Sequence, residues 1–198
     1  MMFSQRTDRQ GFVTCAMVSG PLAEPYTNDH RDTQQIRYEA WLRSIIAQHE
    51  PVTDTLHPIL GQNSRLGQPW RCHFDMDSGF VDCSAFYSTM RRVRFDVAMC
   101  LIAPRDMKVE AMLWSWAAVD LYCNGAKLGD IPSPVYKPIS HLKVTLPLMA
   151  GRNMIYLACC NLGVRDTRSS VALQLRTGSE EIGVAFPDEK HEAEILAA

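Results

Sequence analysis

The stretch that decides the fold runs from Arg91 to Ala103 and reads RRVRFDVAMCLIA. Apolar residues alternate with polar ones in its first half, which is the period of a β-strand with one buried face. In its second half both faces become apolar, as expected where a strand enters the middle of a sheet. The sequence therefore predicts a central β-strand over residues 91–103.

Further strand-like stretches lie on both sides of this segment. They cover residues 11–18, 70–76, 79–87, 107–116, 118–123, 141–148, 154–160 and 169–175. The clearest turn between them is Asn124-Gly125, because a type I′ hairpin needs positive φ at both central positions. Short strands at such spacing, with no helix between them, are typical of antiparallel sandwiches and barrels. We therefore predict a mainly β fold, an antiparallel β-sandwich.

One stretch near the N-terminus has a helical period instead. Its apolar residues recur at i, i+3, i+4 and i+7, at Tyr38, Trp41, Leu42 and Ile45. Asp32 can cap this stretch and Pro51 ends it, so we predict one N-terminal amphipathic helix over 33–49.

Three regions are expected from these patterns. Residues 1–64 form an N-terminal extension, with a strand and the helix packed on the sandwich. Residues 65–178 form the sandwich itself. Residues 179–198 form a C-terminal strand and an acidic linker or the start of a following domain, which indicates a piece of a longer protein.

Composition limits the classes of partner. The chain has 198 residues, 46% hydrophobic and 21% charged, which is enough to bury a sizeable core without disulfide or metal staples. Its formal net charge of -2 supplies no basic excess for phosphate contacts, so no nucleic-acid partner is predicted. No run approaches the roughly 18 apolar residues of a membrane span, so no membrane partner is predicted either.

The cysteines bear on compartment and cofactors. There are seven, an odd number, with no C-x-x-C pair, and most lie in apolar strand-like runs. Reduced core thiols in a cytoplasmic protein fit this usage, and the start of the chain lacks the apolar core of a signal peptide. No zinc-ligand spacing and no nucleotide-binding glycine motif occurs, so neither a metal nor a cofactor is predicted.

Residues 117–175 carry a pattern that resembles a known family. A strand ends in Asn124-Gly125, Gly129 follows, and an alternating strand leads to the turn Leu148-x-x-Gly151-x-Asn153 and a return strand. The pattern resembles the galactose-binding-like jelly-roll domains attached to glycoside hydrolases such as β-galactosidases and rhamnosidases. The resemblance implies a jelly-roll sandwich and a non-catalytic accessory domain. Such a domain positions the catalytic domain of the same longer chain and contacts saccharide through loops at the sandwich edge.

The candidate saccharide contacts are aromatic and polar residues in the second half of the chain. Trp114 and Trp116 lie two residues apart on one strand face and can form an aromatic platform, or can belong to the sandwich core. Tyr136 is a further candidate. Asn161, Arg165 and Asp166 lie in a predicted loop over 161–168, where Arg165 and Asp166 can clamp vicinal hydroxyls or form an ion pair that holds the loop.

Catalytic signatures are weak in this sequence. No pair of carboxylates stands out as glycoside hydrolysis requires, and no G-x-S-x-G elbow is present. We therefore assign no catalytic residue and predict a non-catalytic carbohydrate-binding-like domain of a larger glycoside hydrolase. Two alternatives stay open, a β-sandwich protein-interaction module without sugar binding and a self-sufficient glycosidase.

Overall fold

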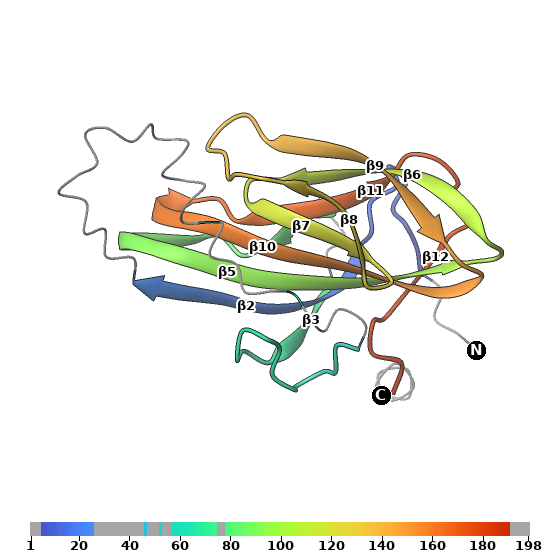
Figure 1. Cartoon of the computed structure of the whole chain (residues 1–198), viewed down its shortest axis with the longest axis horizontal. Coiled ribbons are helices and arrows are strands. Elements are labelled where there is room, and N and C mark those ends of the chain that lie inside the picture. Colours follow the sequence, from blue (N-terminus) through green and yellow to red (C-terminus); the bar gives the residue numbers. More distant parts are fainter. Residues whose placement is uncertain (1–4, 26–45, 47–51, 53–56, 75–77, 191–198) are drawn as a thin grey trace.

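The computed structural model describes residues 5–25, 46, 52, 57–74 and 78–190. Their regular structure is almost entirely β, in two antiparallel sheets (Figure 1). No helix in this part of the chain is long and apolar enough to span a membrane. The predicted helix over 33–49 lies outside the described residues, apart from Ile46.

The larger sheet has eight strands, and two long central ones organise it. Its main path runs β1 (Gln5–Arg6), β12 (Gly183–Ala185), β5 (Ala85–Ala103), β10 (Gly151–Thr167), β7 (Ala118–Cys123) and β8 (Ala126–Ile131). β2 (Cys15–Pro25) also pairs with β5, and β3 (Trp70–Phe74) pairs with β2. The predicted strand 91–103 lies within β5, between β10 on one side and β2 and β12 on the other, so its central position is confirmed.

The smaller sheet has four strands in the order β4 (Val81–Asp82), β11 (Ser170–Leu175), β6 (Met107–Ser115) and β9 (Ser140–Leu148). β6 and β9 pair along their whole length, from Met107 opposite Leu148 to Ser115 opposite Ser140. All pairings between the named strands of both sheets are antiparallel, as predicted.

One hydrophobic core joins the inner faces of the two sheets. The larger sheet contributes Val97, Met99, Ile155 and Leu157, and the smaller sheet contributes Val109, Leu113, Leu146 and Leu173, all without solvent exposure. The Sγ of Cys123, on the larger sheet, lies 3.9 Å from the carbonyl oxygen of Pro147 on the smaller one. The two layers are therefore in direct contact, which fixes which face of each strand is the inner one.

The turn residues behave as the sequence predicts. Asn124 and Gly125 have φ values of 49° and 84° and connect β7 to β8, which are the positive angles of a type I′ hairpin. Asn153 is fully buried and donates to the carbonyls of Met149 and Gly151 at 2.7 and 3.0 Å. The Asn124 side chain in turn donates to Asn153 Oδ1 at 2.8 Å and accepts from the Met154 amide at 2.9 Å. The hydrogen-bonding groups of both asparagines therefore hold the connections of the fold.

Residues 57–69 cover part of the outer face of the larger sheet. Arg65 of this segment lies 2.6 Å from Asp96 of β5, and bridges join Leu60 to Trp70 and Asn63 to Pro69. Ile46 is buried and packs with Ala118 and Cys160 in a separate apolar cluster. Cys159 belongs to the main core instead, so the two neighbouring thiols point to opposite faces of β10, as a strand requires.

Candidate functional site

The outer face of the smaller sheet carries the two tryptophans that the sequence singled out. On β6 the residues Val109, Leu113 and Ser115 are buried toward the core, so Trp114 points to the opposite face, where it is half-buried. Its indole Nε1 donates to the Gln174 side chain at 3.1 Å. The ring also lies 5.4 Å, centroid to centroid, from the imidazole of His141 on β9. These contacts hold the Trp114 ring in one orientation at the surface.

Trp116 lies just beyond the end of β6 in a different setting. Its ring centroid is 5.7 Å from that of Phe80, which in turn is 6.0 Å from Phe12. The guanidinium carbon of Arg168 lies 5.4 Å above the Trp116 ring. Trp116 is therefore part of an aromatic row whose members pack on one another, whereas Trp114 borders the open part of the face.

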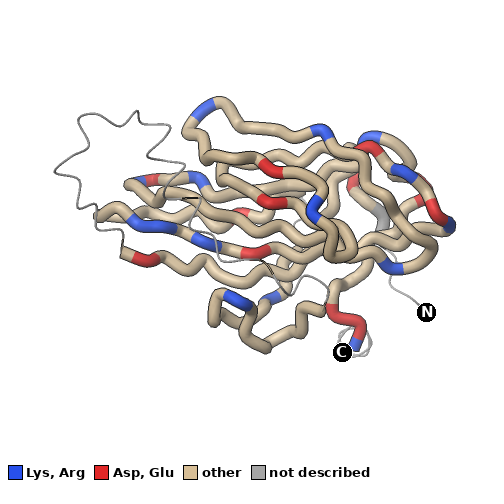
Figure 2. Tube along the Cα trace, in the orientation of Figure 1, with Lys and Arg blue, Asp and Glu red and all other residues tan. Residues whose placement is uncertain are grey.

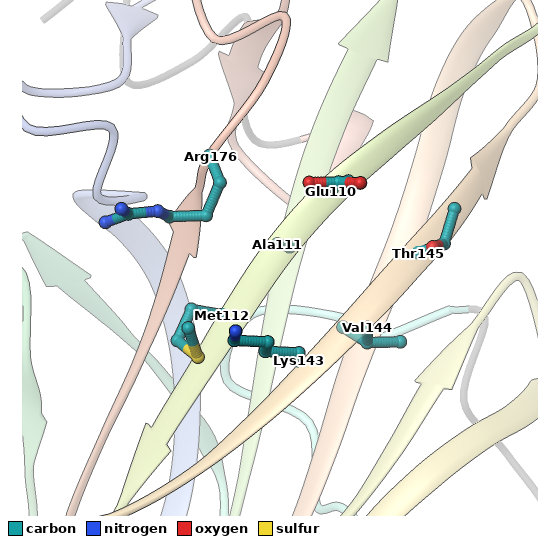
Figure 3. Close-up of a pocket in the computed structure, with 7 residues that line it drawn as sticks. All are labelled: Glu110, Ala111, Met112, Lys143, Val144, Thr145 and Arg176. Atoms are coloured by element: carbon teal, nitrogen blue, oxygen red, sulfur yellow. The ribbon is translucent and has the colours of Figure 1, made fainter.

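A groove of about 570 Å³ lies on this face, along β6 and β9. Residues of β6, of β9 and of the segment after β11 line it, namely Glu110, Ala111, Met112, Lys143, Val144, Thr145 and Arg176 (Figure 3). Glu110 and Thr145 lie toward one end in this view, and Met112 and Lys143 lie toward the other. The polar lining side chains Glu110, Lys143, Thr145 and Arg176 are all exposed.

The charged groups of this groove are available to a ligand. Within the described residues no ion pair involves Glu110, Lys143 or Arg176. Glu110 offers acceptor oxygens, and Lys143 and Arg176 offer donors, so the groove presents both kinds of hydrogen-bonding group. Hydrogen bonds to ionised side chains are stronger than those between neutral groups.

Gln174 on β11 connects the aromatic ring to the groove. Its Oε1 accepts from Trp114 Nε1 at 3.1 Å and from Arg176 Nη1 at 3.3 Å, and its Nε2 donates to the Gln10 carbonyl at 2.8 Å. One fixed amide thus orients both Trp114 and Arg176. Sequence reasoning missed Gln174 together with Glu110, His141, Lys143 and Arg176. Four of these residues occupy outward-facing positions in strands whose apolar and polar residues alternate, and that alternation was the available signal. Arg176 follows the end of β11.

Tyr136 lies away from this groove. It is 72% exposed in the connection between β8 and β9, with the Lys137 Nζ 5.6 Å from its ring centroid. The neighbouring Val135 amide donates to the Trp116 carbonyl at 2.9 Å, which places the connection at the end of β6.

The predicted loop over 161–168 is mostly strand, so that prediction is wrong. β10 continues to Thr167, because β5 begins as early as Ala85 and supplies a partner. Gly163, the glycine that suggested a loop, lies at a register shift in the pairing of β10 with β5, between Gly163 and Arg165.

The candidate residues of that stretch separate into two settings. Asn161 is buried, and its Nδ2 donates to the Arg168 carbonyl at 2.7 Å and to Ser169 Oγ at 3.1 Å. Arg165 and Asp166 are exposed and lie opposite Tyr87 and Phe86 of β5. In the described part of the chain no ion pair joins these two side chains. The structure therefore does not bring the six candidate residues to one site.

A second polar cluster lies beneath residues 57–69, on the outer face of the larger sheet. Asp96 of β5 is fully buried, with one oxygen 2.6 Å from Arg65 Nη2 and the other 2.8 Å from the Tyr156 hydroxyl. Burial raises the pKa of the Asp96 carboxyl, and the Arg65 charge opposes that rise. A pocket of about 200 Å³ lined by Arg65, Trp70 and Tyr156 adjoins the cluster. Sequence reasoning missed this cluster.

The seven cysteines are free thiols. Six cysteines are buried and Cys72 is exposed, and none forms a disulfide. Burial raises the pKa of Cys83 to about 12 and that of Cys123 to about 11. In the residues that the structure describes, no three His, Cys, Asp or Glu side chains are grouped so that they could hold a metal ion.

No protein-family model and no curated protein matches this chain. Among solved structures it is similar to a family 35 carbohydrate-binding module from an environmental isolate. That match has 16% identity and a TM-score of 0.37, and it covers 56% of this chain and 80% of the module. It is also similar to an Arthrobacter globiformis T6 isomalto-dextranase complexed with panose. There the identity is 10%, the TM-score is 0.28, and the match covers 58% of this chain and 24% of that one.

Proposed function

We propose that this protein is a non-catalytic, saccharide-binding jelly-roll β-sandwich that contacts its ligand through the outer face of the smaller sheet. The observation that carries the proposal is the Trp114 ring, held by Gln174 and His141 on the same sheet face as a groove whose charged side chains form no ion pair within the described residues. Gln174 holds this ring and Arg176 together through one amide oxygen, so the aromatic and polar parts of the face are arranged before a ligand arrives.

Sugar chemistry matches the two parts of this face. A pyranose has an apolar C–H surface that stacks on an aromatic ring, and hydroxyls that both donate and accept hydrogen bonds. Trp114 supplies the ring, Glu110 the acceptor, and Lys143 and Arg176 the donors. Ligand sites of this kind combine apolar surface with a few placed polar groups.

We further propose that the domain belongs to a larger glycoside hydrolase and positions its catalytic domain. The support is the resemblance of residues 117–175 to accessory jelly-roll domains, carried by Asn124-Gly125, Gly151 and Asn153. The sugar-binding part of the proposal departs from that resemblance in one respect. It uses the face of a sheet in place of the loops at the sandwich edge.

Affinity gel electrophoresis tests the saccharide-binding proposal. The protein is run through gels that contain dextran, xylan, mixed-linkage β-glucan or galactan. We expect at least one polysaccharide to retard the protein, and Trp114→Ala to weaken that binding roughly tenfold or more, as for an aromatic hot spot. Phe86→Ala is the matched control, because Phe86 is 72% exposed and lies on β5, away from the smaller sheet.

Two results would contradict the proposal. One is normal migration in all four gels, and the other is a Trp114→Ala variant that is retarded as strongly as the unmodified protein. Thermal unfolding of both variants establishes that a loss of retardation reflects the missing ring and not loss of the fold.

A protein-interaction module is the second candidate, and one observation favours it. Phe86 is 72% exposed and Val164 is 44% exposed, and both lie where β5 and β10 pair at one end of the larger sheet. Exposed apolar groups that lie close together can mark a docking surface. This alternative predicts that none of the four polysaccharides retards the protein.

A further inference from the structure

The candidate face has two ends that differ in chemistry. At one end the aromatic pair Trp114 and His141 lie directly opposite each other on β6 and β9. At the other end Glu110 lies opposite Thr145. The two ends are four residues apart on both strands, which is about 13 Å at about 3.3 Å per residue.

A single sugar cannot use both ends. A pyranose ring is no longer than about two residues of an extended strand, so one ring placed on Trp114 leaves Glu110 out of reach. A chain of several sugars joined by glycosidic bonds can follow β6 and contact the aromatic end and the polar end together.

The middle of the face is suited to hold the rings between these ends. Met112 lies there opposite Lys143. The Met112 side chain is 9% exposed, and its flexible thioether gives the groove an adaptable apolar floor. Lys143 can donate to hydroxyls above that floor. The polar side chains around the groove are themselves exposed, so they line an open surface and do not enclose the end of a chain.

We infer that the ligand is an internal stretch of a polysaccharide, at least three sugars long, that lies along β6 from Trp114 to Glu110. This inference rests on the proposed saccharide binding and adds the size and direction of the ligand. It makes Glu110 a binding residue for a sugar other than the one that stacks on Trp114.

Isothermal titration with oligosaccharides of increasing length tests the inference. The mono-, di-, tri- and hexasaccharides of the polysaccharide that retards the protein most are titrated into the unmodified protein and into Trp114→Ala and Glu110→Gln. We expect affinity to rise at least about tenfold from the mono- to the trisaccharide and then to level off. Both substitutions should weaken hexasaccharide binding, and Glu110→Gln should weaken the binding of the hexasaccharide more than that of the monosaccharide.

Glu180→Gln is the control for Glu110→Gln, because Glu180 is exposed in the turn after β11 and does not line the groove. If the monosaccharide binds as tightly as the hexasaccharide, or if Glu110→Gln binds the hexasaccharide like the control, the inference is overturned while saccharide binding at Trp114 stands. If no saccharide binds the unmodified protein, the proposed function fails and the inference fails with it.

Discussion

The outer faces of the two sheets both carry charged residues, but these residues differ in how far they are exposed to solvent. On the larger sheet Asp96 and Arg94 are buried, and Arg65 from the segment 57–69 covers Asp96. On the smaller sheet Glu110 and Lys143 are exposed. The type of residue therefore does not decide whether a charged side chain is buried or exposed. The segments that cover the face decide it.

The physical reason is the cost of removing a charge from water. A buried carboxylate needs compensating partners, and Asp96 has them in Arg65 and Tyr156. Glu110 and Lys143 keep their hydration and can exchange water for the hydroxyls of a ligand. Figure 2 shows a basic stretch within β5, which contains Arg91, Arg92 and Arg94, while elsewhere basic and acidic residues are interspersed.

Removing the buried carboxylate should give the largest effect. Asp96→Ala leaves the Arg65 guanidinium buried without its counter-charge, and the Tyr156 hydroxyl without its acceptor. Breaking a buried pair in this way costs roughly 3–5 kcal/mol. We expect a loss of that size in the free energy of unfolding, measured by urea denaturation at neutral pH.

Asp120→Ala is the control for this substitution. Asp120 also lies on the larger sheet, 2.8 Å from Lys127, but both side chains reach solvent. Exposed pairs contribute about 0.2–1 kcal/mol, so the control should lose far less stability. Equal losses in the two variants would show that the cover over Asp96 does not matter energetically.

The ion pair at the margin of the covered face should give an intermediate effect. Arg94 Nη2 lies 2.9 Å from Glu24 Oε2, and the Arg94 side chain is 9% exposed while that of Glu24 is 41% exposed. Glu24→Ala leaves a buried guanidinium with a lost acceptor, which costs about 1–3 kcal/mol. Glu181→Ala, which removes the partner of the exposed Arg105, serves as the control in the same urea titrations. A control that is destabilised as much as Glu24→Ala would contradict the prediction.

These contrasts also define what the sequence could predict. Alternation in 91–103 predicted the central strand, and Asn124-Gly125 predicted the hairpin, because both signals are local. Alternation cannot show that Arg65, 31 residues before Asp96, returns to cover it. For that reason Asp96 looked like an ordinary outward-facing residue of β5.

The candidate site divides in the same way. Trp114 was named as a candidate saccharide contact from its place on a predicted strand. Gln174 and His141 were not named, because they come from strands that only the sheet order places beside β6. The polar stretch 161–168 was predicted to be a loop because it contains glycine and charged residues. It forms a strand because the early start of β5 pairs with it, which is again a contact between distant segments.

A smaller, pH-dependent effect should come from the edge of the smaller sheet. Burial alone would raise the pKa of Asp82, but hydrogen bonds from Ser84 and Ser170 outweigh it and lower that pKa. A carboxyl group whose pKa is lowered by folding stabilises the folded state at pH values above its unfolded pKa of about 3.9. This stabilisation is lost as the pH falls through the pKa of the folded state. We therefore expect Asp82→Asn to be less stable than the unmodified protein at pH 6.

In acid the Asp82 carboxyl is protonated and therefore uncharged, like the amide that replaces it in Asp82→Asn. The difference in the free energy of unfolding between the variant and the unmodified protein should therefore shrink toward pH 2 to 3. Urea titrations across this range measure it, and we expect no more than about 1 kcal/mol because Asp82 is exposed. A difference that stays constant with pH would show that the charge of Asp82 is not the cause.

The smallest effect on stability should come from the open face itself. Glu110→Gln combined with Lys143→Ala removes two charged groups that are exposed and form no ion pair within the described residues. Surface substitutions of this kind usually change stability by less than about 0.5 kcal/mol. Urea denaturation should therefore give nearly the same free energy of unfolding as for the unmodified protein, even though we propose that the same two changes weaken saccharide binding. If the double variant loses as much stability as Glu24→Ala, these side chains support the fold, and the contrast between a covered, stabilising face and an open, binding face does not hold.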